Sequence, residues 1–211
     1  DVVHEDRNIQ TILSESRLAL NKAGIEGPYL LSPHSLPGIE ALYWAQKYPD
    51  EIEAIIGLDM AVPEYYENMG INMPLMKLGQ CAADLGITRV IPGLAESDAI
   101  KYGTLTEEEK NIYRALFYYR TATETMIDEA KSIKENAKIV AQNGVPQVAM
   151  LLFISDGTGG TGFDKETWRR IPKEYISEVE SGKYMELDCP HYVHDYEYER
   201  ISEEIKNFLG D

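Results

Sequence analysis

One strand–turn–helix–strand segment near the start of the chain most constrains how this sequence can fold. A short apolar run at Tyr29–Leu31 breaks at the turn-prone residues Ser32–Pro37. A helical pattern follows over about Ile39–Tyr48, and a second apolar run covers Ile52–Leu58. Two neighbouring strands joined through a helix form a parallel crossover unit. The segment therefore predicts two parallel strands, with Ser35 in the turn at the carboxyl end of the first strand.

Strand and helix patterns resume after residue 143. The continuous apolar run Val145–Ser155 is typical of a strand buried on both faces, and it ends at Asp156. Further elements are expected at about Lys165–Glu180 (helix), Tyr184–Leu187 (strand) and Ile201–Leu209 (helix), and an opening helix at about Arg7–Ala23. Parallel strands that alternate with helices define an α/β fold, with a mostly parallel sheet flanked by helices.

The middle of the chain loses strand character altogether. Thr106 and Glu109 form a capping box that starts a helix running to about Arg120, and a second helix is expected over about Thr123–Lys138. We therefore expect a core formed by residues 1–62 and 144–211, interrupted by an all-helical insertion at residues 63–143.

Length, composition and charge bound the classes of partner. The chain has 211 residues, 44% of them hydrophobic, which is enough for one substantial core with an insertion. The formal charge of -16, from 36 acidic and 20 basic residues, would repel nucleic acid and anionic lipid alike. No apolar stretch approaches the ~20 residues that span a bilayer. We expect a soluble, acidic protein with no nucleic-acid partner and no membrane span.

Cysteine usage points to a reducing environment. Cys81 and Cys189 fall in different segments and provide no disulfide framework. The printed sequence also opens without a basic-then-apolar leader. The expected localisation is cytoplasmic.

The serine turn and a late histidine loop together resemble the α/β-hydrolase superfamily. The segment His34–Pro63 is similar to the strand, nucleophile elbow, helix and strand of that family. The loop Asp188-Cys-Pro-His-Tyr-Val-His194 has the family's His-aromatic-x-His pattern between the last strand and the final helix. The helical insertion resembles the family's cap. The resemblance extends over nearly the whole chain and implies the α/β-hydrolase fold.

The resemblance also implies a catalytic triad. Ser35 would be the nucleophile, His191 the general base, and the backbone N–H of Leu36 part of the oxyanion hole. Asp156 is the first choice for the acid that orients His191, because in the family a proline-led strand ends at this residue. Asp156 could equally cap the glycine-rich turn that follows it. Asp59, at the end of the preceding strand, is the alternative acid, and the sequence leaves the choice open.

Several residues are candidates for lining a substrate pocket. Met60, Tyr65 and Tyr118 could form an apolar wall, since methionine and aromatic side chains adapt to acyl or aromatic groups. His34, beside the serine, is a further candidate for substrate binding. Ordinary packing explains the first three equally well, and packing or a local hydrogen bond explains His34.

Two departures from the family pattern bear on these expectations. Both glycine positions of the elbow pattern G-x-S-x-G hold proline, Pro33 and Pro37. Pro37 can open a helix, but it biases Leu36 away from helical backbone angles, which could move the oxyanion donor. The family's first strands, about four in number, have no counterpart in this sequence, and their absence would expose a sheet edge. We expect another segment or a partner subunit to supply them.

The predicted function is that of a serine hydrolase that cleaves an ester, or less commonly an amide, through an acyl-enzyme on Ser35. The partner would be a small-molecule ester or amide, and no cofactor is implied. A non-catalytic binding protein of the same fold is the alternative. A metal-dependent enzyme built on Cys189, His191 and His194 is a third possibility, because thiolate and imidazole ligate zinc well.

Overall fold

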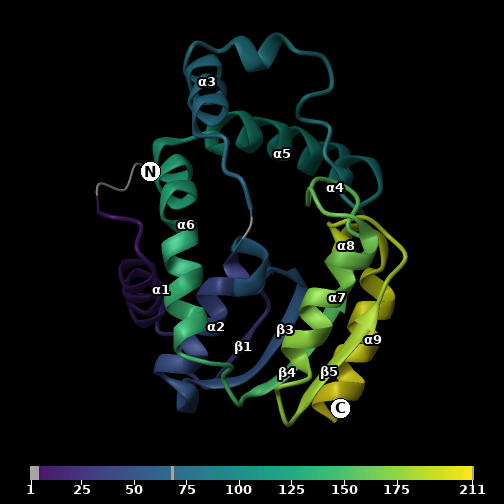
Figure 1. The fold of residues 1–211 in the computed structure, drawn as a ribbon. Helices are drawn as coiled ribbons and strands as arrows, with labels where there is room; N and C mark the ends of the chain where they lie inside the picture. Colours follow the sequence, from purple (N-terminus) through teal and green to yellow (C-terminus); the bar gives the residue numbers. More distant parts are fainter. Residues whose placement is uncertain (1–4, 68, 211) are drawn as a thin grey trace. The chain divides into compact units, whose positions relative to one another are not determined.

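The computed structural model describes residues 5–67 and 69–210. The chain forms two compact units. One consists of residues 69–133 together with the described residues up to Asn8, and the other of residues 9–67 and 134–210. Each unit is described by itself below (Figure 1).

The larger unit is built on a parallel sheet. Its strands are β1 (Tyr29–Leu31), β2 (His34–Ser35), β3 (Ile52–Met60), β4 (Ala149–Ile154) and β5 (Gly182–Glu186). The order across the sheet is β1-β3-β4-β5, every pairing is parallel, and the short β2 continues alongside the end of β3. Because all strands run the same way, their carboxyl ends lie at one edge of the sheet.

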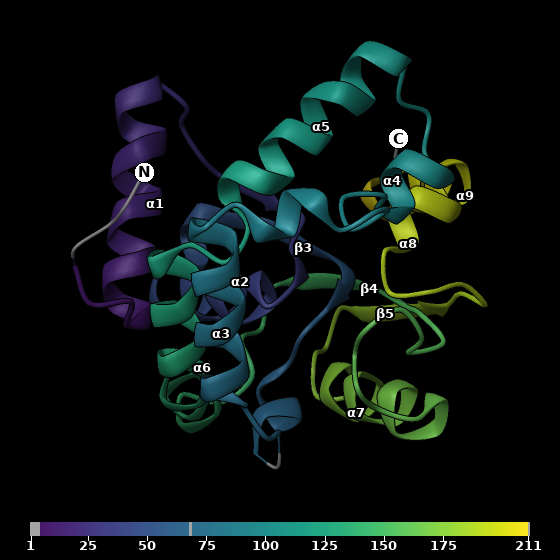
Figure 2. The same ribbon diagram turned by 90° about the horizontal axis from the view of Figure 1, so that it is seen from above.

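Helices cover both faces of this sheet. They are α1 (Ile9–Ala23), α2 (Pro37–Lys47), α7 (Lys165–Ile176), α8 (Val193–Tyr196), α9 (Tyr198–Leu209) and the second half of α6 (Glu124–Gln142). Figure 2 shows α7 and α9 on opposite sides of β4 and β5. The predicted α/β fold with a parallel sheet flanked by helices is confirmed.

Side-chain alternation explains why the middle strands are apolar where they pair, at Ala54–Leu58 and Ala149–Phe153. Ile56 on β3 stands opposite Leu151 on β4, and both belong to a buried cluster with Phe153, Val193 and Ile201 from β4, α8 and α9. The residues between them on the strands point to the other face and are equally buried. A strand covered by helices on both faces needs this unbroken apolar run.

The smaller unit is helical. It contains α3 (Met73–Asp84), α4 (Asp98–Lys101), α5 (Glu107–Arg120), the first half of α6 and the 3-10 turn Ile87–Val90. Thr106 and Glu109 form the predicted capping box at the start of α5. Two further 3-10 turns, Pro49–Glu51 and Pro63–Tyr66, belong to the larger unit. The expected insertion boundaries, residues 63–143, stay a prediction.

Element boundaries differ from the expectations at a few ends. The strand expected from Val145 begins only at Ala149, and the one expected at Tyr184–Leu187 lies at Gly182–Glu186. The helix expected to reach Glu180 ends at Ile176. The apolar residues beyond these ends pack in loops, where burial does not require a helix or a ladder of hydrogen bonds.

The turn that contains Ser35 is held against β3 on both sides. The Pro33 carbonyl accepts from Leu58 N at 2.9 Å, and the Ser35 carbonyl accepts from Ala61 N at 2.8 Å. Helix α2 then starts so close to the chain after β3 that a Cβ on Gly38 would lie 2.3 Å from the Ala61 carbonyl oxygen. The residue that must lack a side chain is therefore Gly38, one position after Pro37.

We expect Gly38→Ala to lower the free energy of unfolding by about 3 kcal/mol, at the upper end of the overpacking range, because the clashing atoms are backbone and have little freedom to move. Chemical denaturation measures this change. Gly79→Ala in α3 is the matched control, since nothing lies within 4 Å of a Cβ there and alanine favours a helix. Equal stability of the two variants would contradict the close approach.

Candidate active site

Four segments of the chain bring polar side chains to the carboxyl edge of the sheet. Ser35 ends β2, Asp59 is the last residue but one of β3, and Ser155 follows β4. His191 lies in the loop between β5 and α8. In open α/β sheets this edge is where ligands bind. The sheet thus gathers residues that are up to 156 positions apart in sequence (191 minus 35).

Strained backbone marks two of these residues. Among the described residues, the non-glycine residues with positive φ are Ser35 (59°), Asp59 (51°) and Ala122 (60°). A non-glycine residue in the left-handed region costs on the order of 1–3 kcal/mol unless its surroundings hold it there. For Ser35 these surroundings are the two hydrogen bonds to the β3 segment. Such strain fits the backbone expected at a nucleophile elbow.

A short hydrogen bond joins Asp59 to His191. The Nδ1 atom of His191 lies 2.6 Å from Oδ2 of Asp59, and both side chains are buried. Because a carboxylate oxygen accepts, Nδ1 carries the proton, and in the neutral ring Nε2 keeps its lone pair. An imidazole in this tautomer can accept a proton from a hydroxyl group.

Three further donor groups complete the environment of the Asp59 carboxylate. The backbone N and the Oγ of Ser155 lie 2.7 Å and 2.6 Å from its two oxygens. The indole Nε1 of Trp168 on α7 donates to the same group, 3.0 Å from Oδ1. Neither the role of Ser155 nor that of Trp168 was predicted from the sequence. The available signal was weak: a buried indole N–H needs some acceptor, but the sequence does not say which.

The structure places Asp59, rather than Asp156, in contact with His191. Oδ1 of Asp156 accepts hydrogen bonds from the backbone N and the hydroxyl of Thr158, at 2.9 Å and 2.6 Å. These bonds shape the turn after β4, which is the alternative role foreseen for Asp156. Its carboxylate is thus engaged within its own turn, while that of Asp59 meets His191. The physical reason is that Asp59 lies on the central strand β3, whose end faces the histidine loop.

The glycine-rich loop after β4 also contacts the histidine loop. The carbonyl of Thr158 accepts from His191 N at 2.9 Å, and a Cβ on Gly159 would lie 3.2 Å from Pro190. The loop therefore supports the backbone of His191.

His34 reaches away from its own neighbourhood. Its Nε2 lies 3.1 Å from the backbone carbonyl oxygen of His191, a residue 157 positions later, so this hydrogen bond is not local, whereas the expected packing is present. The His34 ring also contacts the rings of His191, Tyr192 and His194. Burial, followed by the nearby His191, lowers the pKa of His34 from 6.5 to about 4.

The other expected pocket residues are spread over different environments. Met60 is buried at the end of β3. Tyr65 is stacked on Trp168 and donates its hydroxyl to the Trp168 carbonyl, and burial raises its pKa. Tyr118 lies on α5 in the smaller unit, in edge contact with Phe117. Tyr65 thus takes part in internal packing that supports the helix contributing Trp168.

Leu36 departs from the expectation that Pro37 would push it out of the helical region. Its φ and ψ are -50° and -43°, and Pro37 occupies the first turn of α2. The carbonyl of Leu36 accepts from Ile39 N at 3.0 Å, as in a 3-10 turn that leads into α2. At the start of α2, Pro37 has no N–H and that of Ile39 is bonded to Leu36, so the backbone N–H of Leu36 is the candidate donor next to Ser35.

The residues considered as metal ligands, among them Cys189 and His191, lie in different chemical environments. Cys189 is buried, and burial raises the pKa of its thiol to about 12. Within residues 5–67 and 69–210, no group of three or more His, Cys, Asp or Glu side chains is placed to hold a metal ion. His191 is already committed to Asp59 through Nδ1.

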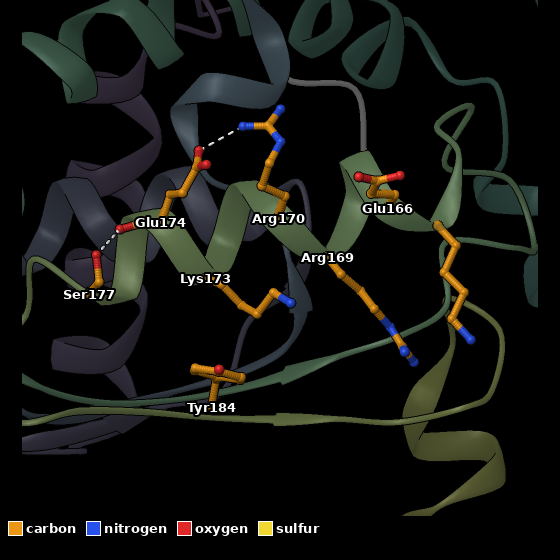
Figure 3. A pocket seen from close by; sticks show the side chains of 8 residues that line it. Glu166, Arg169, Arg170, Lys173, Glu174, Ser177 and Tyr184 are labelled. Atoms are coloured by element: carbon orange, nitrogen blue, oxygen red, sulfur yellow. Dashed lines mark hydrogen bonds and ion pairs between the residues drawn. The ribbon is translucent and has the colours of Figure 1, made fainter.

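A hollow of about 810 Å³ lies along α7 (Figure 3). Its lining includes the four cations of the helix: Lys165, Arg169, Arg170 and Lys173. Each of them is paired with a carboxylate, those of Asp188, Glu186 and Glu174. Its cations are thus already neutralised, so the hollow offers no unpaired charge for an anionic ligand.

This ion-pair network also holds the strand ends next to the site in place. Arg169 donates to the carbonyl of Ser155 at 3.0 Å and to that of Leu187 at 2.7 Å, so it joins the ends of β4 and β5. Hydrogen bonding by Lys173 lowers the pKa of Glu186. The ion pairs that line the hollow along α7 therefore help to place Ser155 against Asp59.

The protein has the α/β-hydrolase fold. An esterase from Exiguobacterium antarcticum superposes with a TM-score of 0.67 at 11% identity, covering 100% of this chain and 77% of that one. An α/β-hydrolase enzyme from a Medee basin deep-sea metagenome library has a TM-score of 0.66 at 16% identity, covering 99% and 74%. An enol-lactonase from Burkholderia xenovorans LB400 has a TM-score of 0.65 at 14% identity, covering 100% and 76%.

One curated relative is similar in sequence over nearly the whole chain. The uncharacterized protein YbdG of Bacillus subtilis (strain 168) is 30% identical over 217 residues, covering 99% of this chain. The chain spans 66% of that protein's length. No family model matches the chain. In the described part of the chain, no helix combines the length and apolar character needed to cross a bilayer.

The environment of His34 predicts a pH dependence of stability. An unfolded histidine takes up a proton near pH 6.5, whereas folded His34 does so only near pH 4. Between these values the unfolded state binds more protons, so acidification favours unfolding. We expect the free energy of unfolding to fall more steeply from pH 6.5 to about 4 in the wild type than in His34→Gln, measured by urea titration across this window. Parallel curves for the two proteins would contradict the depressed pKa.

Proposed function

We propose that this chain is a serine hydrolase that cleaves an ester, or less commonly an amide, through an acyl-enzyme on Ser35. The observation that carries the proposal is the buried hydrogen bond between Asp59 and Nδ1 of His191. It leaves Nε2 of His191 as the proton acceptor at the edge of the sheet where Ser35 sits in a strained turn. Along the chain, Ser35 comes first, Asp59 second and His191 last, which is the order of nucleophile, acid and base in a catalytic triad on this fold.

The reaction would proceed in two acyl-transfer steps. Ser35 Oγ attacks the substrate carbonyl while Nε2 of His191 takes the hydroxyl proton. The N–H of Leu36 stabilises the negative charge that develops on the carbonyl oxygen. His191 returns the proton to the leaving alcohol or amine, and water then hydrolyses the acyl-enzyme by the same route. Asp59 holds the His191 ring and stabilises its protonated form.

The substrate class rests on the fold and on its neighbours. Esterases and an enol-lactonase are among the solved structures with the same fold, and their names refer to esters and lactones. We therefore propose a small-molecule ester as the substrate, which is an inference by analogy. Ser35 supplies the nucleophile and His191 the base, so this route needs no cofactor.

Labelling with a fluorophosphonate tests the nucleophile. Serine displaces fluoride from this reagent only when it is activated, so we expect the peptide containing Ser35 to be labelled. Peptide mass spectrometry would locate the label, and Ser35→Ala is the control that removes it. A folded protein that stays unlabelled would instead support a binding protein of this fold, the alternative that the two elbow prolines suggest.

The choice of acid has its own matched pair of variants. We expect Asp59→Asn to lower the labelling rate by about 10⁴-fold, because an amide at this position stabilises the wrong tautomer of the histidine. Asp156→Asn removes a carboxylate of the same size from the neighbouring turn and is expected to change the rate by only about threefold. If the labelling rate, measured in a time course, fell more in Asp156→Asn than in Asp59→Asn, the acid would be Asp156.

We also propose that another segment or a partner subunit supplies strands that pair with the edge of β1, which no strand of the described residues covers. Leu30 on this strand is 43% exposed, and a hollow of about 230 Å³ beside it is lined by Leu31, Pro33 and Trp44 among others. An apolar strand with an unpaired edge tends to associate.

The isolated 211-residue chain tests this edge. We expect it to self-associate in sedimentation experiments and to melt over a broad range, because the edge of β1 and its apolar surroundings lack cover. A monodisperse monomer that unfolds in one sharp transition would contradict the proposal.

A further inference from the structure

His34 connects the two segments that the proposed mechanism must hold together. It directly precedes Ser35 in β2, and its Nε2 donates to the backbone carbonyl of His191 at 3.1 Å. The proton donor and the proton acceptor of the first chemical step therefore lie on residues joined by one side chain. A shift of the histidine loop would have to break this hydrogen bond first.

The His34 ring is fixed in orientation by its neighbours. Its centroid lies 4.5 Å from that of His191, 4.8 Å from that of Tyr192 and 4.9 Å from that of His194. These three rings belong to the loop between β5 and α8 and to α8 itself. The side chain is thus packed against three rings of this region, and its Nε2 atom makes the hydrogen bond to the His191 carbonyl.

The protonation state of His34 follows from this environment. A carbonyl oxygen only accepts, so Nε2 carries the proton, and in the neutral ring Nδ1 does not. The groups with charge or titratable protons that face it are His191, His194, Asp59 and Tyr192. Burial and the two histidines lower the pKa of His34 to about 4, so the ring is neutral at pH 7. A cation here would disfavour the imidazolium that His191 must form.

We propose that His34 is a positioning residue: its Nε2–H holds the backbone of His191 and thereby sets the distance between Ser35 and the imidazole. The proposal rests on the proposed function and deepens it. Asp59 fixes the direction of the His191 ring through Nδ1, and His34 fixes the position of the residue that bears the ring. The role differs from the substrate binding expected from the sequence, because the donor atom is already used within the protein.

Two amide variants separate positioning from substrate binding. Gln places its Nε2 amide at nearly the same reach as Nε2 of histidine, whereas the shorter Asn places its amide near Nδ1. We therefore expect His34→Asn to lower the maximal labelling rate by fluorophosphonate about 10- to 100-fold, with unchanged apparent affinity, because a displacement near 1 Å has such an effect. We expect His34→Gln to recover most of that loss.

Kinetics distinguish the outcomes. A lower maximal rate in His34→Asn that is rescued in His34→Gln supports the proposal. A weaker apparent affinity at unchanged maximal rate would mean that His34 binds the reagent, and it would overturn the proposal. Wild-type behaviour of both variants would overturn it as well.

NMR of the histidine rings provides a test that needs no activity. The chain has four histidines, so single substitutions assign their ring nitrogens. We expect wild-type His34 to carry its proton on Nε2, and the His191 resonances to shift in His34→Asn but little in His34→Gln. A proton on Nδ1 of His34, or His191 resonances unmoved in both variants, would refute the positioning role. If wild-type protein resists labelling, the proposed function fails. The NMR result then still tests whether His34 holds the backbone of His191.

Discussion

The site depends on a buried carboxylate that must be satisfied. Taking the charge of Asp59 out of water costs several kcal/mol unless hydrogen bonds replace the lost hydration. Its donors come from residues 96, 109 and 132 positions away: Ser155, Trp168 and His191. The end of β4, helix α7 and the histidine loop must all be in place before this carboxylate is satisfied. The parallel sheet provides that arrangement, because every strand ends at the same edge.

Much of this could be predicted from the sequence, because it depends on local patterns. The apolar run through β4, the serine turn before α2 and the histidine loop after β5 are each legible within a few residues. The partner of His191 could not be predicted, because Asp59 and Asp156 both lie at the carboxyl ends of parallel strands and differ in the direction of the carboxylate. That direction is set by a backbone with φ of 51° at Asp59 and by donors more than 90 residues away. The hydrogen bonds from Thr158 to Asp156 are local, but the same sequence pattern fits an acid that orients His191, so the sequence does not decide between the two roles.

The elbow shows how a tight turn can tolerate two prolines. Pro33 needs no N–H at its position, and its carbonyl is paired with Leu58. Pro37 occupies the first turn of α2, where an N–H would lack a partner within the helix. The close approach to the chain after β3 falls on Gly38 instead. The pattern G-x-S-x-G describes one way to build the turn, and the underlying requirement is a small residue wherever the helix meets the strand.

The donors around Asp59 constrain which sequence changes such a chain can accumulate. A carboxylate that receives four donor groups has little capacity to accept another, so its partners constrain one another. Loss of the Ser155 hydroxyl would remove one of the donors to Oδ2, and a compensating change would have to arise at Trp168 or in the loop of His191. These positions are therefore expected to covary among homologues as one epistatic group. Asp156, whose partners lie two residues away, is free to drift with its own turn.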